Sequence, residues 1–179
     1  AKLGWRPKGF VVAGDTLSGK GEGLVGGLAS ALKKKGLPVL AAPASPGGRF
    51  LSSLPGLLRA MEAGEADCLV LAAGFADSFH RTPPRELEAV LHAVADRARE
   101  KGFKRIVVLL PPVSPGMEDL VRPYRVMLSD LARRLRLDVA DLSSLLGSDA
   151  FLAPGCAARY PSAAALERAV RSLAADLAR

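Results

Sequence analysis

The chain has 179 residues, of which 49% are hydrophobic and 24% charged, and this composition predicts one soluble globular domain spanning residues 1–179. No apolar run approaches the roughly 18 residues that a membrane-spanning helix needs, so we expect no transmembrane segment. No basic region followed by an apolar stretch marks a secretory signal either. The chain begins with Ala1 rather than Met, as a trimmed or processed chain does, and its compartment stays open.

Lysine and arginine together outnumber the acidic residues by 25 to 18, which gives a formal net charge of +7 at pH 7. Such an excess is compatible with a polyanionic partner. The basic residues are spread along predicted helices, however, and the few aromatic residues are not interleaved with them. We therefore do not expect nucleic acid as the partner. Another protein, a glycan or another anionic ligand remains open.

Apolar runs and helical periodicity alternate along the chain. The runs predict strands at Phe10–Ala13, Leu37–Ala41, Asp67–Ala73, Arg105–Leu110 and Leu137–Asp141. Helical spacing predicts helices at Gly23–Lys35, Leu51–Ala63 with an interruption near Pro55, Arg85–Lys101, Met117–Leu135, Leu142–Leu146 and Ser162–Ala178. The alternation predicts a three-layer α/β/α sandwich with a five-stranded parallel sheet in the flavodoxin-like order 2-1-3-4-5.

In such a sheet, ligands bind at the carboxyl ends of the strands. Four segments should meet at this carboxyl edge: Gly14–Ser18, Pro43–Gly48, the loop Gly74–Phe79, and the loop Phe151–Pro161. We expect the site to lie among them.

Gly14 to Lys20 fits G-x-x-x-x-G-K, the pattern of a phosphate-binding P-loop, which makes a nucleotide-binding protein a minor alternative. Gly21 stands where a Ser or Thr should hold magnesium, and no acidic residue ends the third strand. Cys68 and Cys156 are too few for a zinc site without neighbouring histidines, and their expected positions argue against a disulfide. We therefore expect neither a metal nor a cofactor.

The same loops, taken together, carry a second resemblance. The matching segments are Gly14-Asp15-Thr16-Leu17, Ser45-Pro46-Gly47-Gly48-Arg49, Gly74-Phe75-Ala76-Asp77, Leu109-Leu110-Pro111-Pro112 and Ala157-Ala158-Arg159-Tyr160-Pro161. In order and spacing they resemble the sequence blocks of the SGNH, or GDSL-type, hydrolase superfamily of esterases, lipases and sugar-ester deacetylases. The resemblance covers nearly the whole chain and implies the same α/β/α fold.

The resemblance also implies which positions would carry catalysis, and four of the five are substituted. Thr16 stands at the position of the nucleophilic Ser, Ala76 at that of the oxyanion-hole Asn, Ala157 at that of the Asp and Tyr160 at that of the general-base His; Gly47 alone is retained. A hydroxyl is a poor nucleophile until a base takes its proton. Tyrosine, with an ordinary pKa near 10, is mostly protonated at pH 7.

Two hypotheses follow for the function. The first is a non-catalytic SGNH-like domain that acts as a binding or structural module. The second is an esterase or acyl hydrolase with a rearranged site in which Thr16 is the nucleophile. Asp15 and Asp77 are expected to accept backbone N–H bonds that tie the loops together. Arg49, Arg159 and Tyr160 are candidates to bind an anion or a sugar. His80 is expected in a solvated loop, and His92 in a structural position on a helix.

Overall fold

The computed structural model describes residues 6–18, 23–45, 48–151 and 160–179. Its strands are β1 (Phe10–Asp15), β2 (Val39–Ala41), β3 (Ala44–Ser45), β4 (Cys68–Ala72), β5 (Arg105–Leu110) and β6 (Asp138–Asp141). In the described part of the chain they form one sheet in the order β2-β1-β4-β5-β6, and every pairing is parallel. The predicted three-layer fold, parallel sheet and flavodoxin-like order are confirmed.

The two-residue strand β3 was not predicted. It pairs with the last two residues of β1, where Gly14 is opposite Ala44 and Asp15 is opposite Ser45. Pro43 separates β3 from β2, and its carbonyl accepts the Gly14 N–H at 3.0 Å. Because proline has no N–H to donate, it interrupts the ladder and splits the expected second strand from this short continuation.

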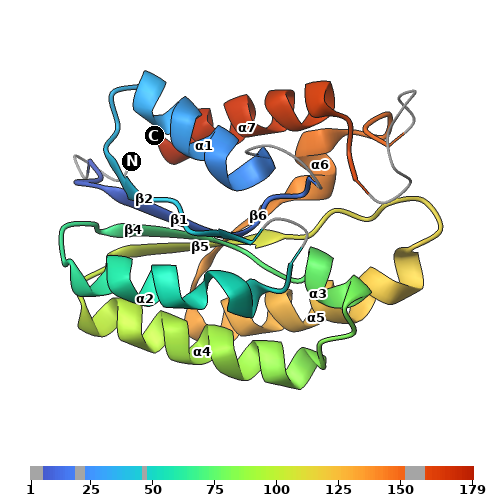
Figure 1. Cartoon of the computed structure of the whole chain (residues 1–179), viewed down its shortest axis with the longest axis horizontal. Coiled ribbons are helices and arrows are strands. Elements are labelled where there is room, and N and C mark those ends of the chain that lie inside the picture. The colour runs from blue at the N-terminus through green and yellow to red at the C-terminus, as the bar shows by residue number, and fades with distance from the viewer. Residues whose placement is uncertain (1–5, 19–22, 46–47, 152–159) are drawn as a thin grey trace.

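The helices are α1 (Gly23–Lys34), α2 (Leu54–Glu62), α3 (Phe75–Phe79), α4 (Pro84–Glu100), α5 (Glu118–Leu135), α6 (Leu142–Leu146) and α7 (Ala163–Leu177), with a 3-10 turn η1 at Phe50–Ser53. Figure 1 shows α1, α6 and α7 on one face of the sheet and α2, α4 and α5 on the other. No helix among the described residues is long and apolar enough to cross a membrane.

Two of these elements correct the sequence prediction. The segment Gly74–Phe79 was expected to be a loop, but it contains the short helix α3, whose Asp77 carboxylate accepts the Gly74 N–H at 3.0 Å. The helix expected at Leu51–Ala63 begins as η1 and continues as α2. Pro55 does not interrupt it, because it occupies the first turn of α2, where no helical N–H bond is lost.

A hydrophobic core lies on each face of the sheet, and β1 contributes to both. Phe10 and Val12 pack toward α1 and α7, whereas Val11 and Ala13 pack toward α2, α4 and α5. All four are fully buried. This two-sided burial explains why the strand is a continuous apolar run rather than an alternating one.

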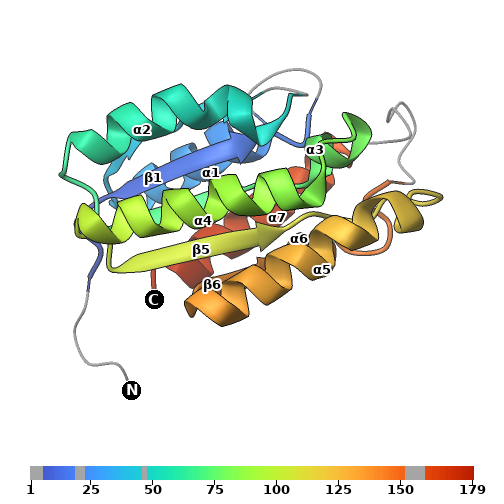
Figure 2. The same ribbon diagram turned by 90° about the horizontal axis from the view of Figure 1, so that it is seen from below.

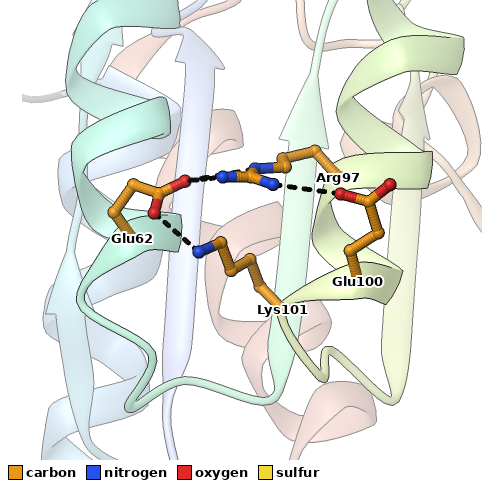
Figure 3. A network of polar contacts seen from close by, with 4 residues as sticks. All are labelled: Glu62, Arg97, Glu100 and Lys101. Carbon is orange, nitrogen blue, oxygen red and sulfur yellow. Dashed lines mark hydrogen bonds and ion pairs between the residues drawn. The ribbon is translucent and has the colours of Figure 1, made fainter.

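An ion-pair network links the ends of α2 and α4 (Figure 3). Glu62 contacts both Arg97 and Lys101, and Arg97 also contacts Glu100. The Lys101 Nζ lies 2.6 Å from a Glu62 carboxylate oxygen. The hydrogen bonds from Lys101 and Arg97 lower the pKa of Glu62. All four side chains are substantially exposed, so the network contributes little to stability, but it fully neutralises the positive charge at this corner.

A glycine near the end of β1 fixes how closely β4 approaches. Gly14 has φ 120°, and a Cβ at this position would lie 1.8 Å from the Ala72 carbonyl oxygen. We predict that Gly14→Ala destabilises the fold by more than about 3 kcal/mol, beyond the usual range for single substitutions. Gly102→Ala is the control, since Gly102 also has a positive φ, 86°, but no atom lies within 4 Å of its Cβ position. It should cost about 1 kcal/mol. Urea unfolding measures both, and equal losses would contradict the close-approach argument.

Candidate functional site

The carboxyl ends of the strands lie at the same edge of the sheet as α3 (Figure 2). The structure brings five of the predicted site residues to this edge: Asp15, Thr16, Arg49, Ala76 and Asp77. Tyr160 joins them through its ring contact with Phe75 of α3. Gly47, Ala157 and Arg159 lie outside the described residues. The described members of the predicted set therefore lie together at this edge, although they come from segments far apart in the chain.

Asp15 connects the turn after β1 to α3. One of its carboxylate oxygens accepts the Leu17 N–H at 2.9 Å, and the other accepts the Ala76 N–H at 2.7 Å. The predicted role of Asp15 as an acceptor of backbone N–H groups is confirmed. The carboxyl group is 2% exposed, and its burial raises the pKa to about 6 even though the two N–H groups favour the charged form.

Asp77, the residue after Ala76 in α3, performs a parallel role. Its carboxylate accepts the N–H of Gly74 at 3.0 Å and that of Phe50 at 3.2 Å, which ties η1 to α3. This confirms the second predicted N–H acceptor. Burial of the carboxyl group raises its pKa, against the opposing effect of the N–H donors. Asp15 and Asp77 are thus two buried carboxyl groups that hold the β1 turn, η1 and α3 together.

Thr16 is 1% exposed, and its hydroxyl group donates a hydrogen bond to the Ser18 carbonyl oxygen at 2.9 Å. Its own carbonyl accepts the N–H of Leu24 in the first turn of α1. The next residue, Leu17, has φ 51°, in the left-handed region. The turn therefore holds the Thr16 side chain inside the protein, with its proton directed at a backbone carbonyl.

Aromatic residues and an arginine line the same edge. The ring of Phe75 contacts Phe79 edge-on at a centroid distance of 5.0 Å and Tyr160 at 6.0 Å with a tilt of 50°. Tyr160 is half-buried, and Arg49 is exposed. The Arg49 guanidinium donates to the His80 carbonyl at 3.4 Å, which connects the η1 segment to the end of α3. Sequence reasoning missed this aromatic cluster, because no local pattern joins Tyr160 to a helix 85 residues earlier.

The two histidines differ in their positions. His80 is exposed at the end of α3, as expected, and lies close enough to Asp15 to lower the pKa of that carboxyl slightly. His92 lies on α4, is about half exposed and pairs with Asp96 at 3.1 Å. Among the described residues, no group of three or more His, Cys, Asp or Glu side chains is arranged to hold a metal ion. Cys68 is buried at the start of β4, where burial raises the pKa of its thiol to about 12.

The P-loop alternative receives no support from the first part of its motif. Gly14 lies within β1, and its N–H bonds to the Pro43 carbonyl in the sheet, so it is not directed toward a phosphate. Gly19, Lys20 and Gly21, the rest of the motif, lie outside the described residues.

We compared the chain with protein-family models, curated protein sequences and solved structures. No protein-family model matches the chain, and no curated protein sequence does so either. Among solved structures, a protein assigned to the lipolytic G-D-S-L family from Desulfitobacterium hafniense DCB-2 superposes with a TM-score of 0.78 at 16% identity, covering 95% of this chain and 99% of that chain. A carbohydrate acetylesterase from Sinorhizobium meliloti gives 0.68 at 14%, covering 96% and 98%.

A psychrotrophic esterase from Pseudoalteromonas sp. gives a TM-score of 0.68 at 13% identity, with coverage of 95% of this chain and 93% of that chain. The chain therefore has an SGNH/GDSL hydrolase-like fold over almost its whole length. At these identities the likeness establishes the fold alone.

The raised pKa of Asp15 predicts a pH dependence of stability. A carboxyl group whose pKa rises from 3.8 to about 6 on folding binds its proton more tightly in the folded state. Its contribution is fully present below pH 3.8 and is lost as the pH rises through about 6, with a ceiling of about 3 kcal/mol. Asp77 acts in the same direction. We predict that Asp15→Asn flattens the stability profile between pH 3.8 and about 6.

Urea unfolding at a series of pH values measures this effect. Asp119→Asn is the control, because the Asp119 side chain is fully exposed. It should leave the profile unchanged. A wild-type profile that rises with pH across this window, or that is equally steep in Asp15→Asn, would contradict the raised pKa.

Proposed function

We propose that this chain is a non-catalytic SGNH-like domain whose carboxyl edge binds a glycan or another anionic ligand. The observation that carries the proposal is the state of Thr16, which is 1% exposed and donates its hydroxyl proton to the Ser18 carbonyl. A nucleophile must reach its substrate and release that proton to a base. Thr16 as placed here does neither.

The second support is the loss of polar groups that would stabilise a transition state. The side chain of Ala76 is a methyl group, and its N–H is already used by Asp15 at 2.7 Å. Removing one donor from an oxyanion hole reduces turnover by about 10²–10³ in a comparable enzyme. Ala157 and Tyr160 in place of an acid and a base would add to that loss, since triad members act as a unit.

The other side chains at the carboxyl edge favour the binding of a ligand. Asp15 and Asp77 hold the loops without any contribution from a catalytic residue. The exposed guanidinium of Arg49 offers donors suited to a carboxylate, sulfate or phosphate group. The half-buried ring of Tyr160, which packs against Phe75, offers an apolar surface at the same edge, and Arg159 immediately precedes Tyr160 in the chain. A partner protein with an acidic surface is the alternative occupant.

The alternative function is ester hydrolysis, because the solved structures named above include esterases. It requires Thr16 to leave its bond to Ser18 and to act as nucleophile with a base from elsewhere on the edge. This alternative makes an acyl or acetyl ester the substrate class.

Ester turnover separates the two functions. We predict that the purified protein hydrolyses p-nitrophenyl acetate and longer acyl esters no faster than its Thr16→Ala variant, because the Thr16 hydroxyl is buried and bonded. Thr16→Ser or Tyr160→His alone should remain at the same background, since each leaves the nucleophile or the base without its partner. Turnover of about 1 s⁻¹ or faster that disappears in Thr16→Ala would establish Thr16 as a working nucleophile.

Ligand binding tests the other half of the proposal. We predict that an array of acidic and neutral oligosaccharides identifies acidic binders, and that Arg49→Gln weakens their binding about tenfold, as expected for one charge-assisted hydrogen bond. Arg122→Gln is the control, because Arg122 is an exposed arginine of α5. No saturable binding to any acidic glycan, or equal loss in both variants, would contradict the glycan assignment.

A further inference from the structure

A basic cleft lies at the amino edge of the sheet, opposite the site described above. Its volume is about 520 Å³, which is within the range of small-molecule sites. Its lining comes from the start of β5, the turn from α5 to β6 and the end of α7. The lining residues are Lys104, Arg105, Ile106, Arg136, Asp138, Asp176 and Arg179.

Two of the four cationic side chains in this cleft are neutralised. The Arg105 Nε donates to the Asp138 carboxylate at 2.7 Å, and Arg179 lies 3.7 Å from Asp176. Lys104 and Arg136 have no acidic partner in the described part of the chain. The nearby network of Glu62, Arg97, Glu100 and Lys101 is different, because every cation in it contacts a carboxylate (Figure 3). The cleft therefore carries two cationic side chains that no acidic side chain balances in the described part of the chain.

The backbone of Arg136 gives an independent reason to expect a role for its side chain. Arg136 follows α5 with φ 53° and ψ 46°, the left-handed conformation that glycine adopts most easily. The chain ends two other helices in the same way. Leu37 N bonds to Leu32 O after Gly36, Phe103 N bonds to Ala98 O after Gly102, and Leu137 N bonds to Ala132 O after Arg136.

The three helix ends share this hydrogen bond, and in each an apolar residue (Leu37, Phe103 or Leu137) follows the left-handed position. Gly36 and Gly102 occupy that position in α1 and α4 with φ 74° and 86°, whereas α5 has arginine there. A left-handed arginine is strained relative to glycine. Arg136 is not needed to cap α5 either, since the Arg99 guanidinium already donates to the Leu135 carbonyl. The backbone conformation alone thus favours glycine at position 136. An arginine at this position adds a guanidinium group to the cleft.

From these observations we infer that the cleft is a binding site for a small phosphate-bearing ligand, held by Arg136 and Lys104 with Arg105 beside them. A guanidinium matches two phosphate oxygens at once, and a lysine ammonium supplies a compact charge. The Asp138 contact fixes the orientation of Arg105 at the cleft wall. The phosphate group is the shared chemistry of free phosphate and a phosphate ester. This site is separate from the carboxyl edge and does not rest on the function proposed for it.

Isothermal titration calorimetry with inorganic phosphate and with phenyl phosphate tests the inference, at pH 7.5 and constant ionic strength. The wild-type protein should bind at least one of them saturably; tighter binding of phenyl phosphate would identify an ester as the ligand class, and equal binding would identify phosphate itself. Arg136→Gly and Lys104→Gln should each weaken binding at least tenfold. Arg133→Gln, which removes the same charge from an exposed position of α5 outside the cleft, should bind as the wild type does.

Thermal unfolding of the same variants separates a ligand-binding role from a structural one. Because glycine relieves the left-handed strain, Arg136→Gly should keep or raise the Tm while losing the phosphate. A lower Tm in Arg136→Gly would assign Arg136 to fold stability and overturn the inference. Absence of saturable binding in the wild type, or equal loss in Arg133→Gln, would overturn it as well.

Discussion

The carboxyl edge of this protein depends on the buried carboxylate of Asp15. It accepts the N–H of Leu17 in its own turn and the N–H of Ala76 in α3, and so joins the β1 turn to a helix 61 residues further along the chain. Asp77 extends the connection to η1. Burying a carboxyl group raises its pKa and disfavours its charge, and the backbone donors offset part of that effect. These two carboxylates and the backbone groups that they accept therefore join the β1 turn, η1 and α3.

Under the function proposed above, these contacts would preserve the SGNH-like fold without requiring the residues that the family resemblance assigns to catalysis. The Thr16 hydroxyl is bonded inside the turn, and Ala76 keeps only the backbone N–H that Asp15 uses. In the account proposed above, the edge keeps its shape and binds rather than hydrolyses. The opposite edge of the sheet has a cleft that contains cationic side chains. These side chains come from the ends of α5 and α7 and from the start of β5.

Much of the fold could be predicted because its signals are long and local. The apolar runs of β1, β4 and β5 and the periodicity of α4 and α5 are long enough to predict these elements. The Gly-Asp turn after β1 predicted that Asp15 and Thr16 lie at the carboxyl edge. The roles of Asp15 and Asp77 followed from their positions beside turns. The five-residue helix α3 and the two-residue strand β3 were missed because they are shorter than one reliable period. The contact between Phe75 and Tyr160, and the left-handed backbone of Arg136, arise from tertiary packing and have no local sequence signal.

The central claim is that Thr16 is not a nucleophile, and covalent labelling tests it most directly. A fluorophosphonate reacts with an activated hydroxyl whatever the natural acyl group, so the result does not depend on choosing a substrate. Intact-mass spectrometry after prolonged exposure should show the unmodified protein alone. A stoichiometric adduct that peptide mapping assigns to Thr16, and that is absent from Thr16→Ala, would contradict the account.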